Sequence, residues 1–173
     1  MIPIIRAAQA VDAERVAEIH VRAWQWAYRD LLPAAFLAGL SVERRAAYWR
    51  RWLSDSGLRR HLWLSTREAH VVGFAATSPS RDADANTETG ELLALYLEPE
   101  IVGTGVGRAL CARAEDGLRH DGFRAATLWV LESNPRARRF YERCGWQVDG
   151  GEKAEEFGDR TAREVRYRKS FTA

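Results

Sequence analysis

The chain has 173 residues, of which 46% are hydrophobic, and its formal net charge at pH 7 is +2. We expect one domain, residues 1–173, with a substantial core, because the length suits a single domain and the composition is that of a globular protein rather than a disordered one. The small net charge without a clustered basic face argues against a nucleic-acid partner. The sequence shows no secretory leader and no apolar run near membrane-spanning length, so we expect a cytoplasmic protein with no membrane association.

The first part of the chain is predicted to be mainly helical. A short strand over Ile2–Arg6 is followed by Asp12, a good N-cap for an amphipathic helix. A short helix starts at Pro33, which is favoured at the first helical position, and stops at Gly39. A further helix begins after Ser41, another good N-cap.

The middle of the chain is predicted to be a run of strands. Residues 62–65 and 71–77 have the pattern of two antiparallel strands, and the polar segment 77–90 that of a loop. The apolar run 92–97 has the length of a strand that is covered on both faces. Pro99 ends this strand, because proline has no N–H to give to a ladder.

A glycine-rich segment then leads from this strand into a helix. An apolar pattern with helical spacing begins here and includes Val106 and Leu110. Its start contains three glycines, Gly103, Gly105 and Gly107. Backbone N–H groups at such a helix start suit a phosphate. The spacing fits neither a P-loop, which needs Lys after its last glycine, nor a dinucleotide fingerprint, whose third glycine comes one residue later. This segment is nevertheless the predicted anion site of the chain.

The last third of the chain completes the predicted sheet. Residues 125–131 form a strand parallel to the apolar one, because a helix crosses over between them. A helix over 134–144 follows, and then a hairpin made of 146–148, a loop beginning at Gly150 and Gly151, and 164–169. The order β-α-α-β-β-β-α-β-α-β-β predicts an α/β fold with a mixed, largely antiparallel central sheet, one parallel strand pair and helices on both faces.

Two longer motifs lie in this second half. The first is Pro99-x-x-x-Gly103-x-Gly105-Val106-Gly107-x-x-Leu110, and the second is Asn134-Pro135-x-Ala137-x-x-Phe140-Tyr141-Glu142-x-x-Gly145-Trp146. In this order and separation they resemble the two signatures of the GNAT superfamily of N-acetyltransferases, whose acetyl-coenzyme A loop reads Gln/Arg-x-x-Gly-x-Gly/Ala. One position departs: Val102 stands where Gln or Arg is usual, which loses a side chain but no backbone amide, and Arg108 offers a nearby positive charge.

The resemblance implies the GNAT fold, acetyl-CoA as cosubstrate, and transfer of its acetyl group to a primary amine of a small molecule or peptide. In the superfamily the loop holds the pyrophosphate, and the pantetheine arm pairs with the strand before the loop. Carried over by position, the cofactor-binding residues are Leu95, Tyr96, Leu97, Gly103, Thr104, Gly105, Val106, Gly107, Arg108 and Asn134. The Leu97 N–H is also a candidate donor to the oxyanion, and Asn134 before Pro135 is a good N-cap besides.

Acetyl transfer needs a proton for the departing thiolate and a base for the amine. Tyr141 is the candidate general acid by resemblance, since a phenol with a pKa near 10 is protonated at neutral pH; packing beside Phe140 is the alternative. Glu91, at the start of the apolar strand, is the candidate base, directly or through water, and a solvated strand-end carboxylate is the alternative. A superfamily variant carries Glu five residues before the helix Asn, but that position is Trp129 here.

Other questions stay open at this level. The aromatic residues of the N-terminal helices either pack or line an acceptor pocket, since that region usually recognises the acceptor in the superfamily. A non-catalytic acyl-CoA-binding regulatory module on the same fold is the alternative function. A homodimer through an edge strand or the terminal hairpin is compatible with the sequence. Cys111 and Cys144 are expected to be buried thiols, and no metal-ligand spacing is present, so no metal is predicted.

Overall fold

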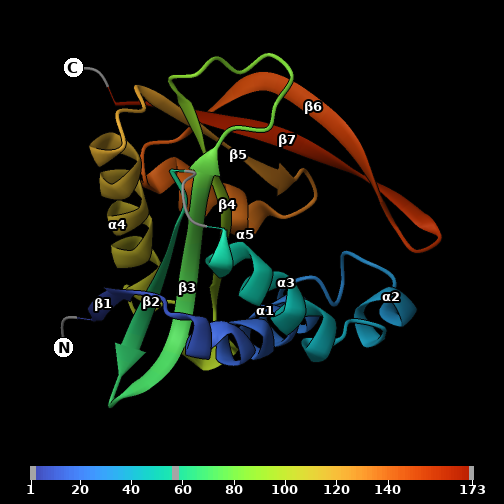
Figure 1. Ribbon diagram of the computed structural model, residues 1–173. Helices are drawn as coiled ribbons and strands as arrows, with labels where there is room; N and C mark the ends of the chain where they lie inside the picture. The colour runs from blue at the N-terminus through green and yellow to red at the C-terminus, as the bar shows by residue number, and fades with distance from the viewer. Residues whose placement is uncertain (1–2, 56–58, 172–173) are drawn as a thin grey trace.

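The computed structural model describes residues 3–55 and 59–171, so Ile2 of the predicted first strand lies outside the described residues. Within them, seven strands form one sheet in the order β1-β2-β3-β4-β5-β7-β6 (Figure 1). The strands are β1 (Ile4–Ala7), β2 (His61–Arg67), β3 (His70–Pro79), β4 (Thr89–Leu97), β5 (Ala125–Leu131), β6 (Gln147–Phe157) and β7 (Arg160–Ser170). The helices are α1 (Ala13–Ala27), α2 (Ala34–Ala38), α3 (Val42–Ser54), α4 (Val106–His120) and α5 (Pro135–Arg143), with 3₁₀ turns at Ala10–Asp12 and Pro99–Ile101.

The sheet is mixed, and its pairing follows from the connections. β4 and β5 pair in parallel because α4 crosses over between them, whereas the other neighbouring strands described here pair antiparallel. The predicted α/β class with one parallel strand pair is therefore confirmed.

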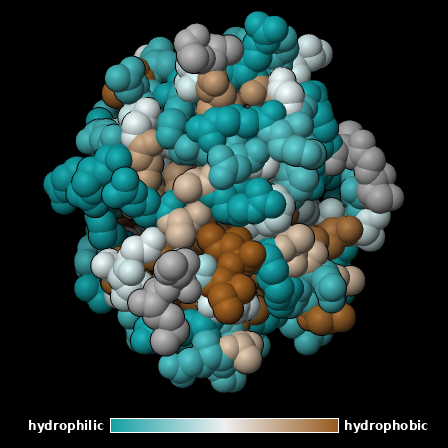
Figure 2. Space-filling model, turned by 90° about the vertical axis from the view of Figure 1, so that its left-hand side faces the viewer, coloured by the Kyte–Doolittle hydropathy of each residue, from teal (hydrophilic) through white to brown (hydrophobic). Residues whose placement is uncertain are grey.

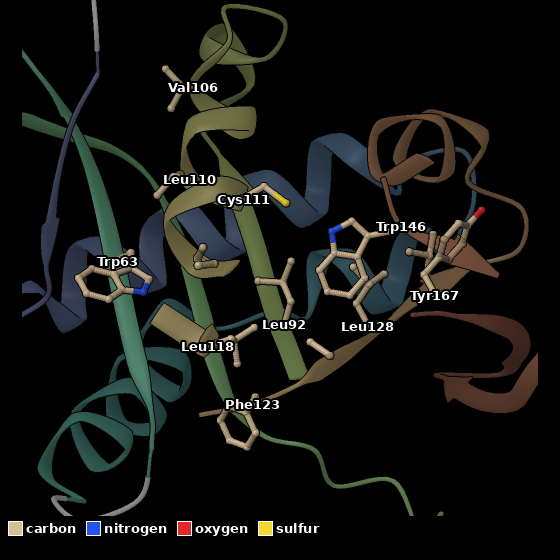
Figure 3. Packing of buried hydrophobic residues seen from close by; sticks show 14 of the residues in the cluster. Trp63, Leu92, Val106, Leu110, Cys111, Leu118, Phe123, Leu128, Trp146 and Tyr167 are labelled. Atoms are coloured by element: carbon tan, nitrogen blue, oxygen red, sulfur yellow. The ribbon is translucent and has the colours of Figure 1, made fainter. Parts of the chain in front are cut away.

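Helices cover both faces of the sheet. α1 and α3 pack on one face, where Ile19, Trp49 and Phe74 belong to one buried cluster. On the other face, α4 buries Leu110 in a second cluster that also contains Leu128 of β5 (Figure 3). α5 borders this second cluster through partly buried residues. The two clusters account for the helices on both faces that the sequence predicts.

A β-bulge in β4 shapes the functional region. Opposite β3, Ala94 pairs with Ala76 and Leu92 with Thr77, so Leu93 is one extra residue in β4. Leu93 and Ala94 consequently both pack toward the α1–α3 cluster. A bulge bends its strand and increases the local twist, and the parallel pairing of β4 with β5 ends just before this point.

The terminal hairpin is longer than the sequence predicts. The predicted loop at Gly150 and Gly151 is wrong, because β6 continues to Phe157 and the turn comes at Gly158, with φ of +67°. The two glycines instead lie where the register between β6 and β7 shifts. β6 is an edge strand that is exposed over most of its length, so it carries charged residues without the apolar alternation that marks a half-buried strand.

Two predicted helix caps have different outcomes. Ser41 caps α3 as expected, because its Oγ accepts a hydrogen bond from the Arg44 N–H at 3.1 Å. Asp12 occupies the N-cap position of α1 but makes no cap bond. Its carboxylate accepts instead from the Gln9 N–H at 2.7 Å and pairs with Arg6 at 2.7 Å, which ties β1 to the start of α1.

The molecular surface shown in Figure 2 is mainly hydrophilic, with apolar residues in a few small groups. Ile4 and Val11 are among the exposed large apolar side chains. Singly exposed apolar residues are normal on protein surfaces. In the part of the chain that the structure describes, no helix is both long enough and apolar enough to cross a membrane.

Candidate active site

A cleft of about 500 Å³ opens where β4 and β5 diverge. The two strands pair only over Thr89–Glu91 and Ala125–Thr127, and beyond these residues they separate. The second half of β4 lines the cleft, together with the end of β5 and much of α5. Ligands in α/β sheets commonly bind outside the carboxyl ends of parallel strands, so this cleft is the candidate site.

The β4 side of the cleft offers backbone hydrogen-bonding groups. The Glu98 N–H donates to the Val72 C=O of β3 at 2.9 Å. Because backbone groups alternate in direction along an antiparallel strand, Leu95 and Leu97 direct theirs away from β3, into the cleft. Tyr96 directs its backbone groups to β3 instead. Of the three predicted pantetheine contacts, Leu95 and Leu97 therefore have the geometry of strand pairing, and Tyr96 only lines the cleft.

The glycine loop lines the same cleft. Gly103 and Gly105 have φ of +88° and +91°, a region that favours glycine, and Gly105 is the N-cap of α4. The Ala109 N–H donates to the Gly105 C=O at 3.2 Å as the first bond of the helix. The preceding N–H groups of α4 have no carbonyl partner within the helix, and Gly107 and Arg108 at this end also line the cleft.

Two other predicted loop residues serve the structure with their side chains. The Thr104 hydroxyl donates to the Ile101 C=O at 2.7 Å, which stabilises the turn before the helix. The Val106 side chain is buried in the core cluster beneath α4. Only the backbone of these two residues is left to serve a ligand.

Tyr141 lines the cleft from α5. Its ring meets Phe140 edge-on, with centroids 5.0 Å apart, and Trp146 at 6.4 Å. Burial raises the pKa of the Tyr141 phenol well above its usual value, and the neighbouring Cys111 and Tyr96 side chains raise it further. The phenol is therefore protonated at neutral pH and can act as a proton donor within the cleft.

Asn134 starts the same helix. Its Oδ1 accepts a hydrogen bond from the Ala137 N–H at 3.1 Å, which confirms the predicted N-cap. The residue is buried and lines the cleft. Because the cap uses only the carbonyl oxygen, the side-chain NH₂ group is free to donate in a second role.

Comparison with known proteins identifies the family. Residues 9–146 match the Acetyltransferase (GNAT) family. The chain belongs to this family. It is 32% identical to an uncharacterized N-acetyltransferase of Bacillus subtilis over 131 residues. This match covers 76% of this chain and 73% of that relative. It is 35% identical to the mycothiol acetyltransferase of Thermobispora bispora over 102 residues. This match covers 57% of this chain but only 33% of that longer relative.

The fold of this GNAT acetyltransferase is also that of solved structures. The PaiA N-acetyltransferase from Thermoplasma acidophilum in complex with coenzyme A superposes with a TM-score of 0.79, covering 99% of this chain and 100% of that one at 20% identity. The YncA protein from Salmonella typhimurium with its cofactor acetyl-CoA gives a TM-score of 0.75, covering 100% and 96% at 21% identity. At these identities the likeness establishes the fold alone, and it confirms the predicted GNAT fold.

Glu91 is not among the described residues that line the cleft of this acetyltransferase. Its side chain is 4% exposed and pairs with Arg81, which donates from its backbone N–H at 3.2 Å, from Nε at 3.1 Å and from Nη2 at 2.9 Å. Asp82, which follows Arg81 in the chain, accepts a hydrogen bond from Trp129 Nε1 at 2.9 Å. Trp129 itself lines the cleft. These contacts favour a positioning role for Glu91, and its predicted role as base stays a prediction.

Further cleft residues were missed by the sequence analysis. The Arg136 guanidinium lies 4.0 Å from the centroid of the Trp26 ring, and burial lowers the pKa of Arg136. Arg136 and Arg143 lie two residues after Asn134 and Tyr141, on a different face of α5 by helical spacing, so the sequence carried no signal that places them at the cleft. The lining residues missed by the sequence analysis include Trp129, Arg136 and Arg143, whereas Trp26 and Tyr28 belong to the aromatic residues for which it left packing and an acceptor pocket open.

The N-terminal aromatic residues of this GNAT protein divide between two roles. Trp49 and Trp52 are buried in the α1–α3 core, whereas Trp26 and Tyr28 line the cleft. His20 accepts a hydrogen bond from Trp49 Nε1 at 3.3 Å through its Nδ1. Burial lowers the pKa of His20 to about 3, so it is a neutral packing histidine at physiological pH.

Replacing His20 by Asn is expected to make folding less sensitive to acid. Below a pH of about 6.5 the unfolded chain binds a proton on this histidine that the folded chain does not bind, so stability falls as the pH drops from there toward about 3. This contribution is about 1.4 kcal/mol per pH unit, or about 2 kcal/mol between pH 7 and pH 5. Asn keeps an acceptor for Trp49 and removes the titration.

Urea unfolding of wild type and His20→Asn at these two pH values measures the difference. His70→Asn changes an exposed histidine and is the matched control. If His20→Asn loses as much stability on acidification as wild type does, His20 is not the group responsible.

Proposed function

We propose that this chain is an acetyl-CoA-dependent N-acetyltransferase, acting as a single domain, that moves the acetyl group to a primary amine of a small molecule or peptide by direct attack. One observation carries the proposal. The cleft combines the backbone groups of Leu95 and Leu97 on β4 with the protonated phenol of Tyr141 on α5. A thioester and a thiol leaving group require this combination of strand-like hydrogen bonding and a proton donor.

The chemistry of the cleft fits acetyl-CoA. The N–H groups at the start of α4 suit the pyrophosphate, because they lie at the positive end of the helix dipole. Arg108, Arg136 and Arg143 add positive charge along the lining and suit the phosphate groups of the cofactor. The amides of the pantetheine arm match the backbone groups of Leu95 and Leu97, and the Asn134 NH₂ can donate to the same arm.

In the reaction, the Tyr141 hydroxyl donates a hydrogen bond to the leaving thiolate sulfur and then its proton. The Leu97 N–H donates to the carbonyl oxygen as negative charge develops there. A water molecule takes the proton of the amine, since the Glu91 carboxylate is held by Arg81. Glu91 acts indirectly. It pairs with Arg81, and the neighbouring Asp82 accepts a hydrogen bond from Trp129 at the cleft.

Glu91→Gln is expected to lower stability more than catalysis. The substitution keeps the shape of the side chain but removes the charge that pairs with Arg81, which costs about 1–2 kcal/mol once the exposure of Arg81 is taken into account. The melting temperature should fall by roughly 3–6 °C, and kcat should change by less than about threefold. Thermal unfolding and steady-state kinetics over a pH series measure both quantities.

Arg81→Gln is the matched variant, since it breaks the same pair from the other side. The two variants should behave alike if Glu91 positions the loop. A loss of rate of about 100-fold or more in Glu91→Gln alone, with the acidic limb of the pH profile removed, would establish Glu91 as the base instead.

The acceptor is proposed from the cleft lining. Trp26, Tyr28 and Trp129 give the cleft aromatic walls beside the β4 edge, which suit an amine carried on an apolar or aromatic group. A thiol-release assay with acetyl-CoA against a panel of amino acids, polyamines, aryl-alkylamines and short peptides tests this. Amine-dependent release establishes the transferase, and release that is greatest with the aryl-alkylamines supports this acceptor class.

A non-catalytic acyl-CoA-binding module is the competing function. It predicts that acetyl-CoA binds in the cleft but that no amine of the panel releases thiol. The presence of the Tyr141 donor favours the enzyme, because a module that only binds does not need a group that protonates the thiolate.

A further inference from the structure

Two cysteines meet at the wall of the cleft, and the proposed reaction uses neither. Cys111 lies on α4 and is 1% exposed, with its sulfur directed into the core on the side where Trp146 lies (Figure 3). Cys144 directly follows α5 and lines the cleft. Both are free thiols, and both belong to the same core region, Cys111 within it and Cys144 packed against it.

The surroundings distinguish the two thiols. Glu115 is buried beneath them, and its carboxylate accepts from Cys111 Sγ at 3.5 Å and from Trp146 Nε1 at 2.9 Å. The Lys169 ammonium donates to Glu115 at 2.7 Å and to the backbone C=O of Cys144 at 2.6 Å. The negative carboxylate thus contacts Cys111 directly, whereas the positive ammonium lies against Cys144.

This arrangement favours the thiolate on Cys144. Pairing with the neighbouring Cys111 thiol and the nearby charges of Lys169 and Arg108 lower the pKa of Cys144 to about 7. The same pairing, burial and Glu115 raise the pKa of Cys111. A reactive thiol reached from a cleft, with a second thiol buried behind it, is the usual arrangement of a redox-sensitive pair.

We propose that Cys144 is an oxidant-sensitive modification site and that Cys111 is its resolving partner. The Cys144 thiolate attacks one oxygen of hydrogen peroxide, the O–O bond breaks, and a sulfenic acid and hydroxide form. The Cys111 sulfur then attacks the Cys144 sulfur, a disulfide forms, and the sulfenic oxygen leaves as water. In total the two thiols give up two electrons and two protons, and one peroxide becomes two waters.

The disulfide joins the helix that starts at the glycine loop to the end of the helix that carries Tyr141. Both helices contribute to the cleft, so the bond is expected to lower acetyl transfer reversibly. This last effect rests on the proposed function, whereas formation of the bond does not. Cys111→Ser leaves the lining of the cleft unchanged, because Cys111 is buried behind it.

Peptide mass spectrometry of the intact chain after treatment with hydrogen peroxide tests the proposal. Trypsin releases residues 109–113 with Cys111 and residues 144–153 with Cys144. We expect these two peptides to be joined in wild type and separated by a dithiol reductant. In Cys111→Ser we expect Cys144 to gain oxygen atoms instead, and in Cys144→Ser we expect Cys111 to stay a thiol.

Alkylation of the untreated protein at neutral pH gives an independent readout. Iodoacetamide should label Cys144 at least about tenfold faster than Cys111, since only Cys144 combines access with thiolate character. Faster labelling of Cys111, or oxygen added to Cys144 in wild type with no joined peptide, would overturn the proposal. These peptide readouts do not depend on turnover, so a failure of the proposed function is seen separately in the thiol-release assay of the reduced protein.

Discussion

Tyr141→Phe is expected to lower turnover about 10- to 1000-fold and to leave the affinity for acetyl-CoA unchanged. The substitution removes one hydroxyl and keeps the ring contacts with Phe140 and Trp146 that seat the side chain. Without the phenol, the departing thiolate loses the proton donor that the proposed reaction assigns to it. Steady-state kinetics give the rate, and calorimetric titration gives the affinity.

Tyr28→Phe is the matched control for this experiment. Tyr28 lines the same cleft from the end of α1, and burial also raises the pKa of its phenol. The Tyr28 hydroxyl has no assigned part in proton transfer, and Phe keeps the aromatic ring in the cleft wall. Loss of this hydroxyl should therefore change kcat by less than about threefold. If Tyr141→Phe turns over at the wild-type rate, another donor or water protonates the thiolate.

Gly105→Ala is expected to weaken acetyl-CoA binding by about 10- to 100-fold, which corresponds to the loss of one charge-assisted hydrogen bond at the helix start. The left-handed φ of +91° disfavours a side chain there, and the added methyl group projects into open space beside the cleft, with no heavy atom of the described residues within 4 Å. The methyl group therefore obstructs the ligand rather than the protein. Calorimetric titration measures the change.

Gly122→Ala separates backbone strain from ligand contact. Gly122 ends the same helix with φ of +84° and likewise has no described heavy atom within 4 Å of an added Cβ. Both variants should lose about 1–2 kcal/mol of stability through the same strain. Only Gly105→Ala should lose affinity, and equal affinities in the two variants would remove the glycine loop from the binding site.

Much of the fold and of the glycine loop could be predicted from the sequence, because local physical chemistry determines these features. The caps made by Ser41 and Asn134 depend on residues close in the chain, and both were predicted. The parallel pair followed from a helical crossover, whose connection leaves little choice of direction. The two family motifs contain residues that line the cleft, and the roles assigned to these residues stay predictions.

The remaining features depend on contacts between distant segments. The bulge at Leu93 brings Leu93 and Ala94 against the same α1–α3 cluster, which an unbroken apolar run does not reveal. Glu91 looked like a free strand-end carboxylate because nothing in the sequence connects it with Arg81. The continuation of β6 beyond Val148 was missed because an exposed edge strand has no apolar period, and its pairing with β7 determines its conformation.

The central claim is that acetyl-CoA lies along β4 with its phosphates at the start of α4. Amide resonances of the nitrogen-15-labelled chain, followed during a titration with acetyl-CoA, test it most directly. We predict saturable shifts and slowed hydrogen exchange at the amides of Leu95, Leu97, Gly107 and Arg108, and no slowing at Tyr96, whose N–H already faces β3. Saturable shifts confined to the separate pocket between α2 and α3, or no binding, would contradict the account.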